Sequence, residues 1–206
     1  MAVSDTEQLV AEALQAQSLE ELSGFAESNP ALARLATAPD LDQLLREVQY
    51  LRSGDQPGRQ LHARILAECH LSPQRRIDEL RRVLSDEPDP KVIRWIVIGF
   101  RNAASASALP DLHSLAHHAS ADVRFPVPDA LSACATSFDD VAHALLELSR
   151  DQDPDVRWSA AFELGAWWAD TKDPRIRRRL SALRTDDESQ EVRNAAADAL
   201  SGGEER

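Results

Sequence analysis

The chain has 206 residues, of which 43% are hydrophobic and 28% charged, so it is long enough to bury a core. Its 35 acidic and 23 basic side chains give a formal net charge of −12, which disfavours binding to nucleic acids and to anionic membranes. Only 7 glycines and one tyrosine are present, which favours helices over sheets. No segment approaches the ~18 apolar residues of a membrane span, so we expect a cytoplasmic protein.

The first 40 residues are expected to form a helical cap. Residues 5–17 and 18–37 are typical of two or three short helices, broken near Ser18 and at Asn29-Pro30. A cap is expected here because the terminal unit of a repeat array must present a polar outer face.

Beyond the cap, four segments of the chain resemble one another. They are EPDPKVIRWIVIGF (87–100), HASADVRFPVPDAL (118–131), DQDPDVRWSAAFEL (151–164) and DESQEVRNAAADAL (187–200). Their valines, Val92, Val123, Val156 and Val192, lie 31, 33 and 36 residues apart. A weaker copy, QPGRQLHARILAEC (56–69), has Leu61 at the valine position. Self-similarity at this period predicts stacked structural repeats over residues 41–201, followed by a tail at 202–206, in a single domain spanning 1–206.

Each repeat is predicted to contain two helices. The first is amphipathic, as in the stripe Leu41, Leu44, Leu45, Val48 and Leu51. A turn rich in Asp, Ser and Pro follows, and these residues cap or begin the second helix. The second helix carries small or apolar residues four and eight positions after its valine, which permits close contact between helices.

The pattern D-x-D-P-x-V-R-x-x-A-x-x-x-L, present as DQDPDVRWSAAFEL, resembles the HEAT repeat, and in particular the compact bacterial form seen in phycobilisome lyases. The resemblance covers about Gln56 to Leu200. It implies an all-α fold, a right-handed α-solenoid of about five helical hairpins after the cap.

The same resemblance implies a ladder of ion pairs between neighbouring repeats. The positions that match are Arg124, Arg157 and Arg193, with Asp122, Asp153 and Asp187 as partners. His62 and Ile93 stand at the arginine position in the first two copies, so the ladder is expected to fray toward the N-terminal half.

The stretch DQDPDVRWSAAFELGAWWAD (151–170) contains three of the four tryptophans. At 100° per residue, Trp167 lies on the same apolar side of the helix as Val156, and Trp168 lies at the edge of that side. Trp158 and Phe162 lie nearly opposite, adjacent to each other. An aromatic pair away from the core stripe is a candidate binding surface.

In HEAT-like arrays the second helices line the concave face, which implies that off-stripe positions project there. The candidate binding residues are Arg94, Trp95, Phe125, Asp129, Trp158 and Phe162. Aromatic side chains supply contact area, and charged ones orient a ligand. The alternative is that these aromatics pack between successive second helices.

Two prolines, Pro126 and Pro128, fall near the start of one second helix. Inside a helix they would cost about 3 kcal/mol each. We therefore expect either a late helix start near Pro126, which is the favoured interpretation, or a local break that exposes backbone groups.

Few residues are candidates for chemistry. His113 and His117 have the i, i+4 spacing of metal ligands, but no matching acid accompanies them, so neither a metal nor a cofactor is predicted. Cys69 and Cys134 are expected to be small buried residues. The basic runs QRRIDELRR and DPRIRRRLSALR are expected to be solvated faces of first helices.

These features favour a non-enzymatic interaction module whose concave face binds a protein or peptide segment, basic and with apolar anchors. The alternative is an enzyme or accessory protein, lyase- or cyclase-like, that holds a hydrophobic small molecule, with Asp129 as acid–base candidate and Arg94 orienting an anionic group. The chain is also similar to HEAT-like bacterial DNA glycosylases, but its acidic balance disfavours that function.

Overall fold

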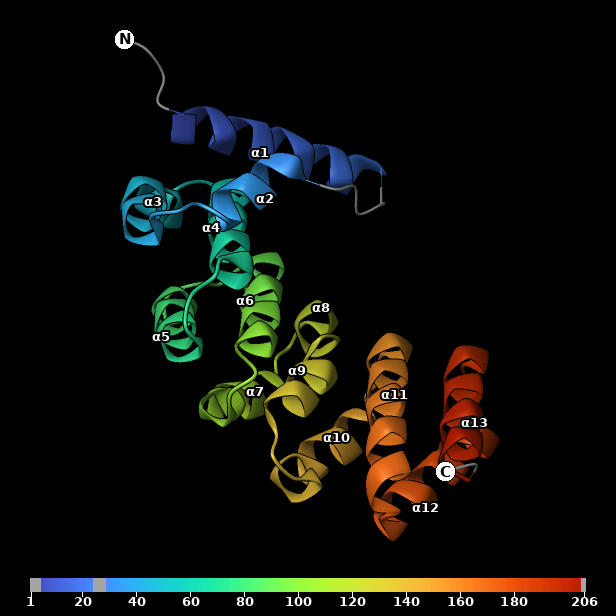
Figure 1. Cartoon of the computed structure of the whole chain (residues 1–206). Helices are drawn as coiled ribbons and strands as arrows, with labels where there is room; N and C mark the ends of the chain where they lie inside the picture. The colour runs from blue at the N-terminus through green and yellow to red at the C-terminus, as the bar shows by residue number, and fades with distance from the viewer. Residues whose placement is uncertain (1–4, 24–28, 205–206) are drawn as a thin grey trace. The chain divides into compact units, whose positions relative to one another are not determined.

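The computed structural model describes residues 5–23 and 29–204 (Figure 1). Every regular element in these ranges is a helix. The prediction of an all-α fold is therefore confirmed. The chain divides into two compact units, Met1–Ala103 and Ala104–Arg206, and each is described by itself.

The first unit opens with two helices before the repeats. Its elements are α1 (Asp5–Ser23), α2 (Pro30–Ala36), α3 (Leu41–Val48), the 3-10 helix η1 (Gln49–Ser53), α4 (Gln56–Glu68), α5 (Pro73–Leu84) and α6 (Pro90–Ala103). The predicted break near Ser18 is wrong, because α1 continues through it; serine costs a helix only a few tenths of a kcal/mol. The predicted break at Asn29-Pro30 is confirmed, since Asn29 accepts a hydrogen bond from the Leu32 amide at 2.9 Å and caps α2.

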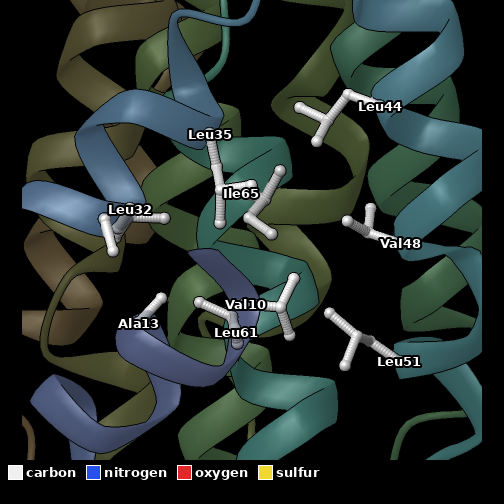
Figure 2. Close-up of a cluster of buried hydrophobic side chains, with 10 residues drawn as sticks. Val10, Ala13, Leu32, Leu35, Leu44, Val48, Leu51, Leu61 and Ile65 are labelled. Carbon is white, nitrogen blue, oxygen red and sulfur yellow. The ribbon is translucent and has the colours of Figure 1, made fainter. Parts of the chain in front are cut away.

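A single apolar cluster joins α1 and α2 to the first repeat (Figure 2). Its labelled members are Val10, Ala13, Leu32, Leu35, Leu44, Val48, Leu51, Leu61 and Ile65. They come from α1, α2, α3, η1 and α4, so α1 and α2 bury apolar surface of the first hairpin.

The second helices of successive repeats, α4 and α6, pack directly on each other. Gly99 on α6 permits this approach, because a Cβ atom there would lie 3.3 Å from the Cα of Ala67 on α4. The same atom would lie 2.5 Å from Leu80 Cδ1 on α5. A glycine in mid-helix is unfavourable by itself, so close packing is the reason for it here.

The second unit continues the pattern of paired helices. Its elements are η2 (Ala106–Ala108), α7 (Leu109–Leu115), α8 (Ala121–Arg124), α9 (Val127–Cys134), η3 (Phe138–Asp140), α10 (Ala142–Leu148), α11 (Pro154–Thr171), α12 (Pro174–Asp186) and α13 (Gln190–Glu204). The late start is confirmed: α9 begins one residue after Pro126, with Pro128 in its first turn. A one-turn helix, α8, precedes it.

Helix α11 carries the tryptophan-rich stretch. Asp153 caps it by accepting a hydrogen bond from the Asp155 amide at 2.9 Å, and the left-handed Lys172 (φ 53°) ends it. Trp168 is buried, whereas Trp167 is half-buried. The Trp167 ring lies against Phe138 in a tilted arrangement, with ring centroids 5.9 Å apart, and its indole N–H donates a hydrogen bond to Ser132 at 3.1 Å. The predicted order of these two tryptophans is wrong, because a helical wheel cannot show how far neighbouring helices cover each ring.

Candidate functional site

The predicted ladder exists, but with different partners. Arg124 forms a two-pronged ion pair with Asp151, with both nitrogen–oxygen distances at 2.7 Å. Arg157 forms the same pair with Asp187, at 2.8 and 2.9 Å. Each arginine thus reaches the acid in the turn before the second helix of the next repeat, 27 or 30 residues later. The pairing of Arg157 with Asp187 joins two residues that were both predicted as ladder members.

The acids predicted within the arginines' own repeats are not their partners. Asp153 caps α11 through two backbone amides, and Asp122 is exposed on α8. Arg193 donates instead to backbone carbonyl oxygens, including that of Glu188 at 3.0 Å. The acid that does pair with an arginine lies two residues before the N-cap of a second helix. Its carboxylate is held in place because it also accepts a hydrogen bond from the N-cap amide, as Asp151 does from the Asp153 amide at 2.9 Å.

A rung of the same kind exists in the first unit. Arg59 donates to Glu87 at 2.9 Å, and Glu87 accepts the Asp89 amide, also at 2.9 Å. The sequence pattern missed it because Arg59 lies before Leu61 rather than after it. The expected fraying at His62 is therefore compensated by an arginine three residues earlier in α4.

These rungs remain charged at neutral pH. Burial works to raise the pKa of Asp151, but hydrogen bonds from Arg124 and the Asp153 amide outweigh it and hold that pKa below its ordinary value. The hydrogen bond to Asp151 in turn raises the pKa of Arg124. Each of these ion pairs joins the second helix of one repeat to the turn before the second helix of the next, so the ladder holds repeats together.

The clearest concave feature of the second unit is a groove between its last two second helices, α11 and α13. Its volume is about 760 Å³. Residues from α11 lining it are Trp158, Phe162, Gly165, Ala166, Ala169 and Asp170, and those from α13 are Glu191, Asn194, Ala195, Asp198, Ala199 and Gly202. Spacings of three and four residues place each set on one face of its helix.

The floor of this groove is made of small side chains, and one wall is aromatic. Trp158 is 40% exposed and Phe162 is 61% exposed, although both are large apolar residues. Their rings stack at 21° with centroids 5.9 Å apart. The prediction that the two rings lie off the core stripe and next to each other is confirmed, and of the two alternatives left open for them the structure shows exposure rather than packing between helices.

The charged residues that line the groove are all acidic. Asp170, Glu191 and Asp198 contribute carboxylates, and none of the twelve lining residues is a lysine, arginine or histidine. A hydrogen bond from the Ser189 hydroxyl at 2.8 Å lowers the pKa of Glu191. The groove therefore combines an aromatic platform with a negative rim at neutral pH.

The other predicted binding residues do not line this groove. Arg94 is exposed and Trp95 is half-buried in the first unit, where the Arg64 guanidinium lies 4.4 Å from the Trp95 ring centroid. Phe125 and Asp129 are half-buried in the second unit. The structure thus brings together Trp158 and Phe162 from the predicted set.

Sequence reasoning missed the α13 half of the groove. Asn194, Ala195 and Asp198 occupy the same positions relative to Val192 as Trp158 and its neighbours do relative to Val156, so the repeat register contained the signal. These α13 residues did not stand out because they are small or polar, and a helical wheel draws attention to large apolar side chains.

The histidine-rich segment of α7 and the following turn has ordinary contacts. His113 Nε2 lies 3.1 Å from the Asp140 carbonyl oxygen, and His117 Nδ1 lies 3.7 Å from Glu147. Within residues 5–23 and 29–204, no cluster of three or more His, Cys, Asp or Glu side chains has the arrangement of a metal site. Over the same part of the chain, none of the helices combines the length and apolarity of a membrane span.

Comparison with known proteins agrees with this architecture. Three of the solved structures that resemble the chain illustrate this. Escherichia coli YibA is 19% identical with a TM-score of 0.65, the match covering 98% of this chain and 76% of YibA. An engineered protein is 22% identical (TM-score 0.59, 99% and 100% coverage), and a designed armadillo repeat protein in complex with the peptide (KR)4 is 19% identical (0.53, 97% and 100%).

No curated protein matches the sequence. The family model for HEAT repeats matches residues 77–164 and 141–202, which together span more than half of the chain. The chain belongs to the HEAT-repeat family.

Proposed function

We propose that this protein is a non-enzymatic binding module that holds an extended, basic peptide segment of a partner protein in the groove between α11 and α13. The observation that carries the proposal is the stacked pair Trp158–Phe162, left accessible beside three carboxylates. The aromatic wall, the charge and the dimensions of the groove all favour a basic peptide as ligand.

The aromatic wall suits a cationic side chain with an apolar stem. A guanidinium or ammonium group over an aromatic face gains about 0.5–2 kcal/mol, depending on how far it is desolvated. Trp158 and Phe162 together offer two adjacent faces on one helix turn. The aliphatic part of an arginine or lysine, or a neighbouring leucine, would cover the apolar remainder.

The charge of the groove selects against anionic ligands. Asp170, Glu191 and Asp198 would pair with basic side chains placed along the segment, and the net charge of −12 would speed the encounter with a basic partner. Nucleic acid is disfavoured by the same charges.

The dimensions and the floor suit a main chain. From Trp158 to Ala169 the groove follows α11 for about 17 Å, at 1.5 Å per residue. A peptide in extended conformation covers that distance with about five residues. The floor residues Ala166, Ala169 and Ala195 carry only methyl side chains, so the backbone of a bound peptide can approach the two helices closely.

The comparison structures add support at the level of the fold. The designed armadillo repeat protein that resembles this chain was solved with the basic peptide (KR)4. A stack of paired helices is therefore able to present a surface for a peptide of that charge.

Fluorescence anisotropy tests the proposal with a labelled ten-residue peptide of alternating lysine and arginine interrupted by two leucines, beside an acidic peptide of equal length. We expect saturable binding of the basic peptide alone, weakened about tenfold by Trp158→Ala and by Asp198→Asn, and weakened further by salt. Matched controls are Tyr50→Ala, which removes another exposed aromatic, and Asp186→Asn, which removes a carboxylate outside the groove.

Three results would contradict the proposal. One is equal affinity of the wild type and Trp158→Ala for the basic peptide. Another is a concentration-dependent dimer in light scattering that Phe162→Ala abolishes, since the groove would then hold a second copy. The third is binding of an apolar dye without any peptide binding, which would support a hydrophobic small-molecule site instead.

A further inference from the structure

A second pocket lies in the first unit, on the side of the first helices rather than the second. It has a volume of about 360 Å³ and is bounded by α3, η1 and α5, with α4 beneath. His62 and Leu66 of α4 line it, so it reaches down to a second helix. All its lining residues belong to the first unit, whereas those of the proposed peptide groove belong to the second.

This pocket is rich in arginine, in a protein whose net charge is −12. The arginines lining it are Arg46, Arg52, Arg75 and Arg82, and the only acids lining it are Asp42 and Glu79. Basic side chains thus outnumber carboxylates two to one at one place on an acidic chain. Such an excess of positive charge attracts a small anion.

The arginines are not all committed to protein partners. Arg75 pairs with Asp42 between α5 and α3, and Arg82 pairs with Glu79 at 2.7 Å. Arg46 forms no ion pair with any residue that the structure describes. Because exposed ion pairs are worth only about 0–1 kcal/mol, an anion of higher charge can draw these guanidinium groups away from single carboxylates.

The position of Arg52 is fixed. It donates to the Arg82 carbonyl oxygen at 2.6 Å and lies 3.5 Å from an Asp86 carboxylate oxygen. These contacts join η1 to α5 and leave the guanidinium at the pocket wall. A guanidinium held in this way offers an oxyanion its remaining N–H groups without further loss of side-chain entropy.

The pocket also contains a buried polar group that lacks a partner. His62 is only 6% exposed, and its Nδ1 atom has no hydrogen-bond partner among the described residues. Burial, and then the charge of Arg52, lower the pKa of His62 to about 4, against a smaller opposing effect of Glu79. The ring is therefore neutral at pH 7 and keeps one N–H group to donate.

We propose that this pocket binds the phosphate group of a small phosphorylated molecule between Arg46, Arg52 and Arg82. A phosphate monoester carries nearly two negative charges at pH 7, which balances the excess of the lining arginines. Its oxygens accept several hydrogen bonds at once, the property that guanidinium groups recognise. Inorganic phosphate shares this chemistry, but the pocket is larger than one phosphate requires, so an organic portion has room beside it.

Isothermal titration calorimetry of the full chain tests the proposal with glycerol 3-phosphate, inorganic phosphate and glycerol as probes. We expect saturable binding of both phosphates, the ester at least as tight as the free ion, and none of glycerol. Arg46→Gln should weaken the binding of both at least tenfold, because it removes a charged hydrogen-bond donor. Arg34→Gln, an exposed arginine that does not line the pocket, is the matched control.

A second readout uses the buried histidine. In a nuclear magnetic resonance titration, the pKa of His62 should rise from about 4 when glycerol 3-phosphate is present, because the negative charge that the bound phosphate keeps at this pH opposes the charge of Arg52. The proposal is overturned if neither phosphate binds saturably, if free phosphate binds more tightly than the ester, or if Arg46→Gln binds as well as the wild type. An unchanged His62 pKa at saturating ligand would also overturn it.

Discussion

Gly165 on α11 faces Ala199 on α13 at a distance that excludes any larger side chain. A Cβ atom at position 165 would lie 2.6 Å from the Cβ of Ala199 and 3.2 Å from its Cα. The two second helices therefore touch at their backbones, and this contact sets the width of the groove between Trp158 and Asp198.

Replacing this glycine should push the two helices apart. We expect Gly165→Ala to lower the free energy of unfolding by about 1–3 kcal/mol, as for other overpacked contacts, despite the better helix propensity of alanine. Urea denaturation followed by circular dichroism measures it. Gly202→Ala on α13 is the control, since nothing lies within 4 Å of its added Cβ. A stabilised Gly165→Ala variant would show that α11 and α13 are not held in this contact.

The Arg157–Asp187 rung should be a major local stabiliser. Both side chains are largely buried, with 13% and 5% exposure, so Arg157→Ala leaves a buried carboxylate without its partner. We expect a loss of about 3 kcal/mol in denaturant unfolding. Arg178→Ala removes an exposed arginine of α12 and should change little. If both variants lost the same stability, the rung would be no more than a surface contact.

Truncation of Trp168 should destabilise the protein far more than truncation of Trp158, although both lie on α11. Trp168 is 7% exposed, so Trp168→Ala should destabilise the protein by about 3–5 kcal/mol through a core cavity. Trp158 is 40% exposed, so Trp158→Ala should leave the melting temperature nearly unchanged. Differential scanning calorimetry compares the two. A large drop for Trp158→Ala would place that ring in the core and remove it from the groove.

His62 should make the protein sensitive to mild acid. Its pKa is near 6.5 in the unfolded chain and about 4 in the folded protein, so the unfolded state binds the proton more readily between these values. Stability should therefore fall as pH decreases from 6.5 toward 4, by an amount on the order of 3 kcal/mol.

Urea unfolding in phosphate-free buffer at pH 7, 5.5 and 4.5 measures this effect. His62→Gln should show a shallower fall than the wild type, whereas His70→Gln, which replaces an exposed histidine, should follow the wild type. Parallel curves for the wild type and His62→Gln would mean that His62 takes up its proton equally easily in both states.

Much of the fold was predictable because it depends on local periodicity. The recurring valines, the proline-acid turns and the stripe of α3 each specify a helix or its start within about ten residues. The late start of α9 after Pro126 follows from the missing proline amide alone. The continuous α1 did not follow, since Ser18 is compatible with a cap or with a helix interior.

The ion-pair partners of the arginines were less predictable. The resemblance indicated two of the arginines that form the ladder, Arg124 and Arg157, but not that Arg124 would reach Asp151 rather than Asp122. The rung between Arg59 and Glu87 has no counterpart in the repeat pattern. A guanidinium reaches several acids near the same turn, and the packing of one hairpin on the next selects among them.

The sequence by itself determined that the chain is a series of helical hairpins, because helix formation, capping and amphipathic spacing are properties of neighbouring residues. It also determined that Trp158 and Phe162 lie off the apolar stripe. Only the tertiary structure decided that this pair lines a groove with Asp198 and Glu191, and that four arginines line one pocket together with His62. Both depend on the contact of helices about 30 residues apart, which no local pattern specifies.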